Sequence, residues 1–392
     1  MTYTSGRHFL QIPGPSNVPD RILHAIGHPT IDHRGPQFKE LSEEVLTGSR
    51  RIFKTSGPVV VFPTSGTGAW EASLMNTLNP GDKVLMFETG HFATLWHNMA
   101  KKFGLEIDFV PTNWRHGVDP GVVEEKLIED KEHKIKSVNV VHNETSTGVA
   151  SKIAEIRQAI DRANHPALFM VDTISSLGSM DYRHEEWNVD VTVGCSQKGL
   201  MLPPGLGFNA ISEKALEASK TATFKRHFWD WDDMLKANEA FFYPSTPCTN
   251  LLFGLRESIK MLEEEGLENV FARHDRFAEA TRRAVRAWGL EVLCEKPEEY
   301  SSVLTAVMMP EGSGADNLRK VILDNFDMSL GNGLGKVADK VFRIGHLGDL
   351  NDLSLVGTLA GVEMGLGLGN INHQKGGVGE AMKYLAEVAA AK

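Results

Sequence analysis

The chain has 392 residues, of which 41% are apolar and 23% are charged, a composition typical of globular proteins and unlike that of disordered ones. Because one domain holds roughly 100–200 residues, we expect two domains. The 41 Lys and Arg residues against 51 Asp and Glu residues give a net charge of −10, which argues against a nucleic-acid partner or an anionic membrane surface, since both need a basic face.

The first segment is an arm without a helix. Residues 12–19 contain three prolines and one glycine, a pattern that forces an extended path. A short β-branched run predicts a strand at 59–62, a turn follows at 63–68, and a helix over 69–78 ends at an Asn-Pro-Gly-Asp sequence. Further strands are expected at residues 83–87, 106–110, 137–141, 168–171 and 189–193, and further helices at 94–103, 121–130 and 153–164.

Short apolar strands that alternate with amphipathic helices predict an α/β fold, with a mostly parallel sheet covered by helices on both faces. The pattern changes beyond Thr249, where two long helices are expected over 251–265 and 267–288 and strands near 302–309 and 340–344. We place the domain boundary along those helices. The expected organisation is an N-terminal arm at residues 1–20, a large domain at 21–255 and a small C-terminal domain at 256–392.

The cysteines and the apolar runs of the sequence indicate in which cellular compartment the protein lies. Cys195, Cys248 and Cys294 are too few and too scattered for a disulfide framework or a zinc module. Residues 1–11 lack the apolar segment of a signal peptide, and no apolar run reaches about 18 residues. The 15 histidines follow no HxH or HExxH spacing, so we expect no catalytic metal. These features predict a cytoplasmic protein without a membrane partner.

A candidate anion site lies in the turn Ser65-Gly66-Thr67-Gly68, between a strand and a helix. The glycines allow a sharp turn, and the helix N-terminus presents free N–H groups and a positive dipole end to an anion. The hydroxyls of Ser65 and Thr67 add donors. An ordinary capped turn is the alternative. Because the turn matches neither a Walker A loop nor a GxGxxG fingerprint, it suits a phosphate monoester better than a nucleotide.

Two charged residues follow apolar strands. Asp172 ends one strand, which puts its carboxylate at the sheet edge where α/β sites lie; a helix N-cap or a turn residue is the alternative. Lys198 stands among small residues directly after the strand at 189–193, although lysine prefers solvated surfaces. In a pocket its amine can lose a proton and form a Schiff base, whereas the alternative is a surface lysine.

The order of these three features indicates a cofactor. An anion-binding turn is followed by an aspartate at a strand end and, 26 residues later, by a lysine at another strand end. A pyridoxal-phosphate enzyme needs this set, because the turn holds the phosphate, the carboxylate pairs with the pyridinium nitrogen and the lysine carries the aldimine. The sequence therefore predicts a pyridoxal-phosphate enzyme.

Seven short motifs are spread in order over almost the whole chain: PGP at 13–15, SGTG at 65–68, NETSTG at 143–148, VD at 171–172, SQKG at 196–199, PPG at 203–205 and RIG at 343–345. Together they resemble the class V aminotransferases of fold type I, and within them the alanine/serine/aspartate–glyoxylate aminotransferase branch. The resemblance implies a large domain with a mostly parallel seven-stranded sheet between helices, a smaller α+β C-terminal domain, and pyridoxal 5′-phosphate as the cofactor.

The resemblance also implies roles for individual residues. Lys198 would be the Schiff-base lysine and Asp172 the partner of the pyridine nitrogen, so these two form the catalytic pair. Thr145 would bond the phenolic oxygen of the cofactor, and Phe92 would stack on its ring. The residues implied in cofactor binding are Ser65, Gly66, Thr67, Phe92, Thr145, Asp172, Ile174, Gln197, Lys198, Tyr243 and Thr246.

Tyr243 and Thr246 resemble the pair that reaches the phosphate in the neighbouring subunit. Such sharing implies a homodimer, with higher assemblies left open. Arg343 resembles the arginine that binds the substrate α-carboxylate, and its planar fork suits that group better than a lysine would. Gly14 of the arm, together with Phe92, would form a close wall that favours glyoxylate, which has no side chain.

The amino donor stays open between aspartate, serine and alanine. An aspartate donor brings a second carboxylate, and burying it unpaired would cost several kcal/mol. Arg34 and His346 are the candidates to bind that carboxylate. The alternative for Arg34 is a surface turn in which it pairs with Asp32. A serine donor needs only a hydroxyl partner.

The predicted reaction is transamination of glyoxylate to glycine, with L-aspartate giving oxaloacetate or L-serine giving hydroxypyruvate. One alternative is a class V lyase or desulfurase, but a desulfurase needs a nucleophilic cysteine in a flexible loop, and neither Cys248 nor Cys294 lies in a Gly/Ser-rich loop. The other alternative is a binding protein that keeps the fold without catalysis. Lys198, Asp172 and Arg343 together argue against that alternative.

Overall fold

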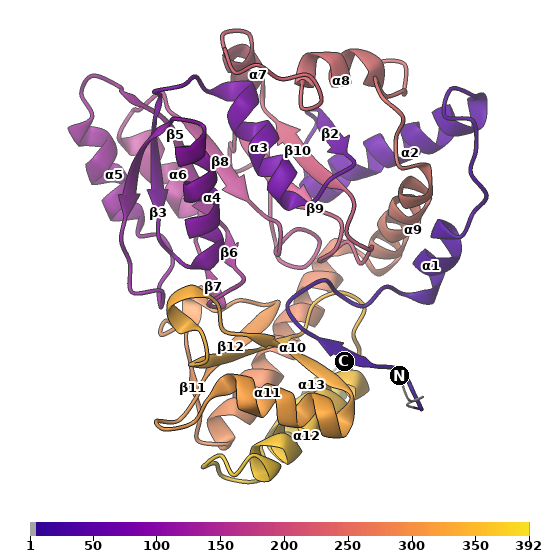
Figure 1. Cartoon of the computed structure of the whole chain (residues 1–392), viewed down its shortest axis with the longest axis vertical. Helices are drawn as coiled ribbons and strands as arrows, with labels where there is room; N and C mark the ends of the chain where they lie inside the picture. The colour runs from indigo at the N-terminus through magenta and orange to yellow at the C-terminus, as the bar shows by residue number, and fades with distance from the viewer. Residues whose placement is uncertain (1–4, 392) are drawn as a thin grey trace.

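The computed structural model describes residues 5–391. A seven-stranded sheet forms the centre of the larger part of the molecule (Figure 1). The strand order is β2-β10-β9-β8-β5-β3-β4, and neighbours are parallel except that β10 runs antiparallel to β2 and β9. In chain order these strands are β2 (Val59–Phe62), β3 (Lys83–Phe87), β4 (Glu106–Val110), β5 (Ile135–Val141), β8 (Leu168–Asp172), β9 (Val191–Cys195) and β10 (Gly207–Ile211).

The sheet confirms the predicted α/β class, and β10 is the strand that was not predicted. Its sequence, Gly-Phe-Asn-Ala-Ile, contains three residues that are depleted in strands. A buried amide holds the strand against the helices on one face of the sheet: Asn209 Nδ2 donates to the backbone oxygen of Ala69 at 3.1 Å, and Asn209 Oδ1 accepts from Trp231 Nε1 at 3.3 Å.

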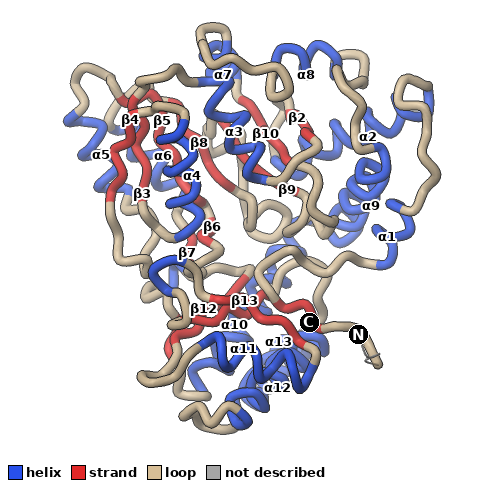
Figure 2. Tube along the Cα trace, in the orientation of Figure 1, coloured by secondary structure: helices blue, strands red, loops and turns tan. Residues whose placement is uncertain are grey.

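Helices cover both faces of this sheet, as Figure 2 shows. The side chains of β2 illustrate the reason, because alternate residues point to opposite faces: Val60 and Phe62 pack with α3 and α4, whereas Val59 and Val61 pack with α2 and α9. The helices around the sheet are α1 (Asp20–Ile26), α2 (Pro36–Phe53), α3 (Gly66–Thr77), α4 (His91–Lys102), α5 (Pro120–Glu129), α6 (Ile153–Arg162), α7 (Glu213–Ser219), α8 (Trp231–Asn238) and α9 (Thr249–Glu265).

A second, five-stranded sheet forms the smaller part of the molecule. Its order is β1-β13-β14-β12-β11, and the edge strand β1 comes from the N-terminal arm, where Phe9 pairs in parallel with Met328 of β13. The strands are β1 (Phe9–Gln11), β11 (Glu291–Val292), β12 (Leu304–Met308), β13 (Met328–Asn332) and β14 (Val341–Gly345). The helices packed with it are α10 (Leu267–Ala287), α11 (Ala315–Phe326), α12 (Asp352–Leu368) and α13 (Gly377–Ala390).

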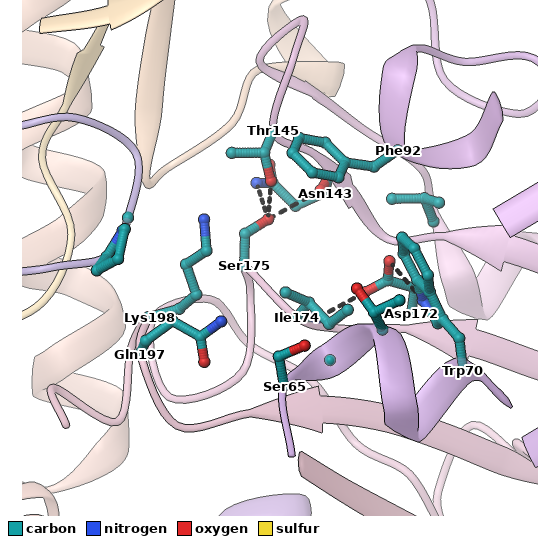
Figure 3. A pocket seen from close by; sticks show the side chains of 15 residues that line it. Ser65, Trp70, Phe92, Asn143, Thr145, Asp172, Ile174, Ser175, Gln197 and Lys198 are labelled. Atoms are coloured by element: carbon teal, nitrogen blue, oxygen red, sulfur yellow. Dashed lines mark hydrogen bonds between the residues drawn. The ribbon is translucent and has the colours of Figure 1, made fainter. Parts of the chain in front are cut away.

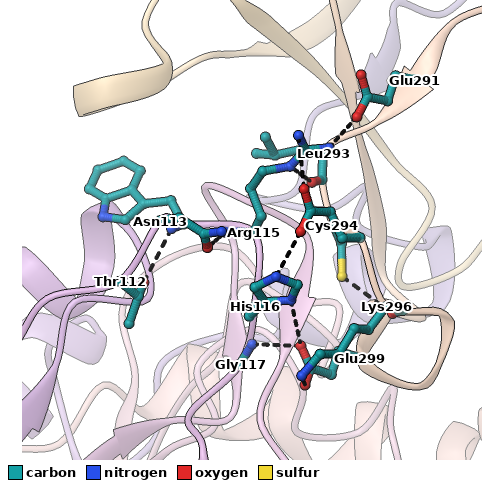
Figure 4. Close-up of polar contacts among 12 residues, drawn as sticks. Thr112, Asn113, Arg115, His116, Gly117, Glu291, Leu293, Cys294, Lys296 and Glu299 are labelled. Carbon is teal, nitrogen blue, oxygen red and sulfur yellow. Dashed lines mark hydrogen bonds and ion pairs between the residues drawn. The ribbon is translucent and has the colours of Figure 1, made fainter.

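The two parts are joined by helix α10 and by a cluster of charged side chains (Figure 4). Arg115 Nη1 lies 3.1 Å from Glu295 Oε1, and His116 Nε2 lies 2.7 Å from the other oxygen of that carboxylate. Glu299, which is almost buried, accepts a hydrogen bond from the backbone N–H of Gly117 at 2.8 Å. Among the helices of residues 5–391, none combines the length and the apolarity that crossing a membrane would require.

Candidate active site

A cavity of about 220 Å³ opens at the carboxyl ends of β5, β8 and β9 (Figure 3). This edge of a parallel sheet is where α/β proteins bind ligands. The hairpin of β6 (Asn143–Glu144) and β7 (Val149–Ala150) follows β5 there, and the N-termini of α3 and α4 face the same space. The lining residues are Gly14, Pro15, Ser65, Gly66, Thr67, Trp70, Phe92, Val141, Asn143, Thr145, Asp172, Ile174, Ser175, Gln197 and Lys198.

Lys198 lies in the loop between β9 and β10, and its amine reaches the arm. The amine donates a hydrogen bond to the backbone oxygen of Pro13, while the backbone oxygen of Lys198 accepts from Ser16 Oγ at 2.8 Å. Burial lowers the pKa of Lys198 to about 8, and the positive charge of Arg343 acts in the same direction. A substantial fraction of the amine is therefore neutral near pH 7.5, the form that can act as a nucleophile or base.

Gly14 follows Pro13 on the arm and lies against the Lys198 side chain. Its φ is +97°, and a Cβ built on it would lie 2.6 Å from Lys198 Cε. A side chain at this position would therefore strain the backbone and displace the lysine.

Asp172 ends β8 on the opposite side of the cavity from Lys198, as Figure 3 shows. One carboxylate oxygen accepts from the backbone N–H of Ile174 at 2.6 Å and the other from Trp70 Nε1 at 3.1 Å. Burial raises the pKa of Asp172 to about 7, and the negative charge of Glu144 adds to this effect, whereas the two hydrogen bonds oppose it.

The predicted anion turn lies at the start of α3. Ser65 is the N-cap, and its side chain makes no capping hydrogen bond, so the hydroxyl and the first N–H groups of the helix are available to a ligand. A Cβ on Gly66 would lie 2.6 Å from Ile174 Cγ1, so a residue with a side chain would clash at this position. Within residues 5–391 the buried amide oxygen of Gln197 has no hydrogen-bond partner.

Thr145 is oriented by a small polar network. Ser175 Oγ accepts from Thr145 Oγ1 at 2.8 Å and from Asn143 Nδ2 at 2.8 Å, and it donates to the backbone oxygen of Asn143 at 2.9 Å. Arg343 Nη1 donates to the backbone oxygen of Thr145 at 2.7 Å. Arg343 does not itself line the cavity but contacts its wall through Thr145. Burial lowers the pKa of Arg343 to about 10, so the guanidinium stays charged at neutral pH.

Glu144 is a buried carboxylate that ties this hairpin to α4. Its Oε1 accepts from the N–H of Phe92 at 3.3 Å and from Ser146 Oγ at 2.6 Å, and its Oε2 accepts from the N–H of Ala93 at 3.0 Å. A Cβ on Gly90 would lie 2.5 Å from Glu144 Cδ. The carboxylate therefore caps the first turn of α4 and sets the position of the Phe92 ring.

Trp70, Ser175 and Glu144 support the site without being predicted as individual site residues. Glu144 stands inside the NETSTG motif, so its place in that motif was an available signal. Trp70 and Ser175 carry no such signal, because their partners lie 102 and 30 residues away in the chain.

Arg34 and His346, the candidates for a second carboxylate, do not line the cavity. Arg34 is exposed in the loop before α2, where its backbone N–H donates to Asp32 Oδ1 at 2.9 Å. His346 is fully buried, with Nε2 3.0 Å from Thr305 Oγ1 and Nδ1 3.1 Å from the backbone oxygen of Ser302. Burial lowers the pKa of His346 to about 3, so its ring is neutral. Both ring nitrogens already have hydrogen-bond partners, so neither is available to a substrate carboxylate.

Tyr243 and Thr246 also lie outside the cavity of their own chain. Thr246 is exposed. The Tyr243 ring packs edge-on against Phe38 at 6.0 Å between ring centres, and its buried hydroxyl has no partner in the described part of the chain. Burial raises the pKa of Tyr243 above its ordinary value, so the phenol is protonated and can donate a hydrogen bond.

The chain is similar to known aminotransferases in both sequence and structure. The family model described as aminotransferase class-V matches residues 9–333. The chain is 46% identical to the serine–glyoxylate aminotransferase of Methylorubrum extorquens, over 100% of this chain and 99% of that relative. It is also 46% identical to the L-aspartate–glyoxylate aminotransferase of Paracoccus denitrificans, over 97% and 96% of the two chains. The solved pyridoxamine–pyruvate aminotransferase of Mesorhizobium loti superposes with a TM-score of 0.91 at 25% identity, over 99% of this chain and all of that one.

Proposed function

Because this chain belongs to the class-V aminotransferases, we propose that it moves the amino group of an L-amino acid onto glyoxylate to give glycine, with pyridoxal 5′-phosphate as cofactor. The observation that carries the proposal is the cavity, which brings a buried amine, a buried carboxylate and a helix N-terminus together. When bound there, the cofactor supplies an electron sink for the α-carbon of the donor.

The residues present fit that cofactor. The hydroxyl of Ser65 and the first N–H groups of α3 suit its phosphate, and Gln197, which also lines the cavity, carries an N–H₂ group that suits the same anion. Phe92, held by Glu144, faces the cavity as a flat apolar wall. Asp172 suits a protonated ring nitrogen, because a positive charge at that point lowers the pKa of the carboxyl and keeps it ionised.

Two groups of the chain would act on the donor. The neutral amine of Lys198 accepts the donor's α-proton as a general base, because burial holds the pKa of this amine near 8. Arg343 binds the α-carboxylate beside Thr145 through its guanidinium fork. The arm passes close to the amine at Gly14, where an added Cβ would overlap Lys198, and this closeness favours an acceptor without a side chain.

Serine and aspartate are both candidate donors, as the names of the relatives suggest. Because neither Arg34 nor His346 lines the cavity, an aspartate side chain would need a cation from elsewhere, such as a partner subunit. A serine hydroxyl would need only a neutral hydrogen-bond partner. We therefore rank L-serine first.

We propose a homodimer in which Tyr243 and Thr246 reach the phosphate site of the partner subunit. Their position outside their own cavity supports this. Mixing inactive Lys198→Ala chains with Tyr243→Phe/Thr246→Ala chains should restore activity in heterodimers that hold one intact shared site, whereas separate sites would show only the activities of the two variants. A cytoplasmic location stays a prediction from the sequence.

A desulfurase is not favoured by the three thiols. Burial raises the pKa of Cys195 and of Cys294 to about 12, and it raises that of Cys248 as well. These cysteines are therefore protonated at neutral pH, whereas a persulfide-forming cysteine must supply a thiolate.

The decisive experiment is an absorbance titration of the cofactor-loaded protein with L-serine and then with L-aspartate, without any keto acid. Loss of the visible band with growth of a near-ultraviolet band would support the cofactor, the half-reaction and the donor together. Lys198→Ala is the matched control, and it should lack the response. A wild-type protein that gains no visible band with pyridoxal phosphate would refute the proposal.

A further inference from the structure

Trp70 links the phosphate-binding helix to the catalytic carboxylate. It lies on the second turn of α3, is 3% exposed, and lines the cavity. Its Nε1–H donates to Asp172 Oδ2 at 3.1 Å, while the N–H of Ile174 donates to the other oxygen.

Both of these partners are donors only, because an indole N–H and a backbone N–H cannot accept the O–H of a neutral carboxylic acid. A protonated Asp172 would therefore carry an O–H that neither partner can accept, and its oxygens would be weaker acceptors. These two hydrogen bonds thus favour the ionised form of Asp172, against the effect of burial.

The direction of the indole N–H is fixed by a second tryptophan. Trp96 of α4 stacks on Trp70 with 5.8 Å between ring centres and 9° between ring planes. Trp96 is fully buried, and its own Nε1 has no hydrogen-bond partner in residues 5–391. In this pair, the indole N–H of Trp70 donates to Asp172, whereas the indole N–H of Trp96 has no hydrogen-bond partner in residues 5–391.

We propose that Trp70 is a positioning residue that keeps Asp172 ionised and aimed at the ring nitrogen of pyridoxal phosphate, an inference that rests on the proposed function. Trp70 acts through the carboxylate and makes no chemical step of its own. Because α3 also carries the phosphate turn at its N-terminus, one helix sets the distance between the two ends of the cofactor.

The test compares Trp70→Phe with Trp96→Phe. Both remove an N–H from the same buried stack, and only the first removes a hydrogen bond. The dissociation constant of pyridoxal phosphate would be measured by visible absorbance between pH 6 and 9.5. A hydrogen bond to a charged group corresponds to about tenfold to a hundredfold in an equilibrium constant, so Trp70→Phe should bind the cofactor more weakly by that factor at pH 6.

The loss should fade toward pH 9.5, because there Asp172 is ionised in both proteins. Trp96→Phe should bind within about twofold of wild type at every pH. The inference would be overturned if both variants lost cofactor affinity equally, or if the loss of affinity in Trp70→Phe did not change with pH. Either result would mean that Trp70 contributes only packing. If wild type itself shows no visible band, the proposed function fails first.

A measurement on the wild-type protein without cofactor covers the case in which Trp70→Phe does not fold. With ¹⁵N-labelled tryptophan, one of the seven indole N–H resonances should shift through a midpoint near pH 7, where Asp172 titrates. The Trp96 resonance, identified from the Trp96→Phe variant, should stay constant. The shifted resonance should change in Asp172→Asn, and indole resonances that are identical in Asp172→Asn and wild type would overturn the inference, because no indole N–H would then reach this carboxylate.

Discussion

Replacing Gly14 by alanine tests whether the arm positions the catalytic amine. The new Cβ would lie 2.6 Å from Lys198 Cε, whereas carbon atoms in contact stay about 3.5–4.0 Å apart. The lysine chain or the arm must therefore move by about 1 Å. A displacement of that size at a reacting group costs about 100-fold in rate, and we expect kcat for serine and glyoxylate to fall by that factor.

Backbone strain must be separated from this displacement. A side chain at positive φ costs about 1–2 kcal/mol, and Gly14→Ala carries that cost as well. Gly6→Ala is the matched control, because Gly6 has a φ of +92° and nothing lies within 4 Å of its added Cβ. Both variants should lose similar stability, and only Gly14→Ala should lose activity.

The assay follows glycine formation at saturating substrates, together with the visible spectrum of each loaded variant. In Gly14→Ala the band should weaken or shift, because the lysine no longer meets the cofactor in its original place. The reasoning would be refuted if Gly14→Ala kept a wild-type kcat and spectrum, or if Gly6→Ala lost as much activity.

Three further predictions follow from the charged groups. Glu144→Gln keeps the shape of the side chain but turns an N–H₂ group toward backbone donors, so unfolding free energy measured in urea should fall by about 1–3 kcal/mol; an unchanged midpoint would contradict the capping role. Arg343→Lys should raise KM for the amino donor about tenfold, since one ammonium cannot grip a carboxylate bidentately; equal KM values would show that the carboxylate binds elsewhere. Cofactor loading of the apo-protein needs the neutral amine of Lys198, so its rate should rise with pH up to about 8 and then level off; a rate that keeps rising to pH 10 would indicate an ordinary solvated lysine.

The sheet and the two charged strand ends were predictable because they depend on local pattern. Short β-branched runs that alternate with helices indicate a parallel sheet, and the carboxyl ends of such strands meet at one edge. This places Asp172 and Lys198 near each other without any knowledge of packing. Strand β10 escaped prediction because Asn209 is held there by Ala69 and Trp231, contacts that no local pattern contains.

The supporting residues of the site depend on packing between distant segments. Trp70 and Ser175 acquire their roles only when α3 and the β6–β7 hairpin meet β8 and the loop after it. His346 stands three residues after Arg343 in the sequence but does not line the cavity. Residues three apart along an extended segment point to opposite sides, and His346 accordingly lies in the interior of the smaller part, away from the cavity.

The antiparallel strand β10 has a consequence for the motion of the lysine. Because β9 and β10 are direct neighbours in the sheet, the loop that carries Lys198 begins and ends on adjacent strands, and Ser196 N–H bonds to the backbone oxygen of Leu206 at 3.0 Å across its base. The pairing of β9 with β10 therefore fixes both ends of this loop. The amides at the base of the loop should therefore exchange with deuterium about as slowly as those of β9, and the backbone of Lys198 keeps its place at the sheet edge.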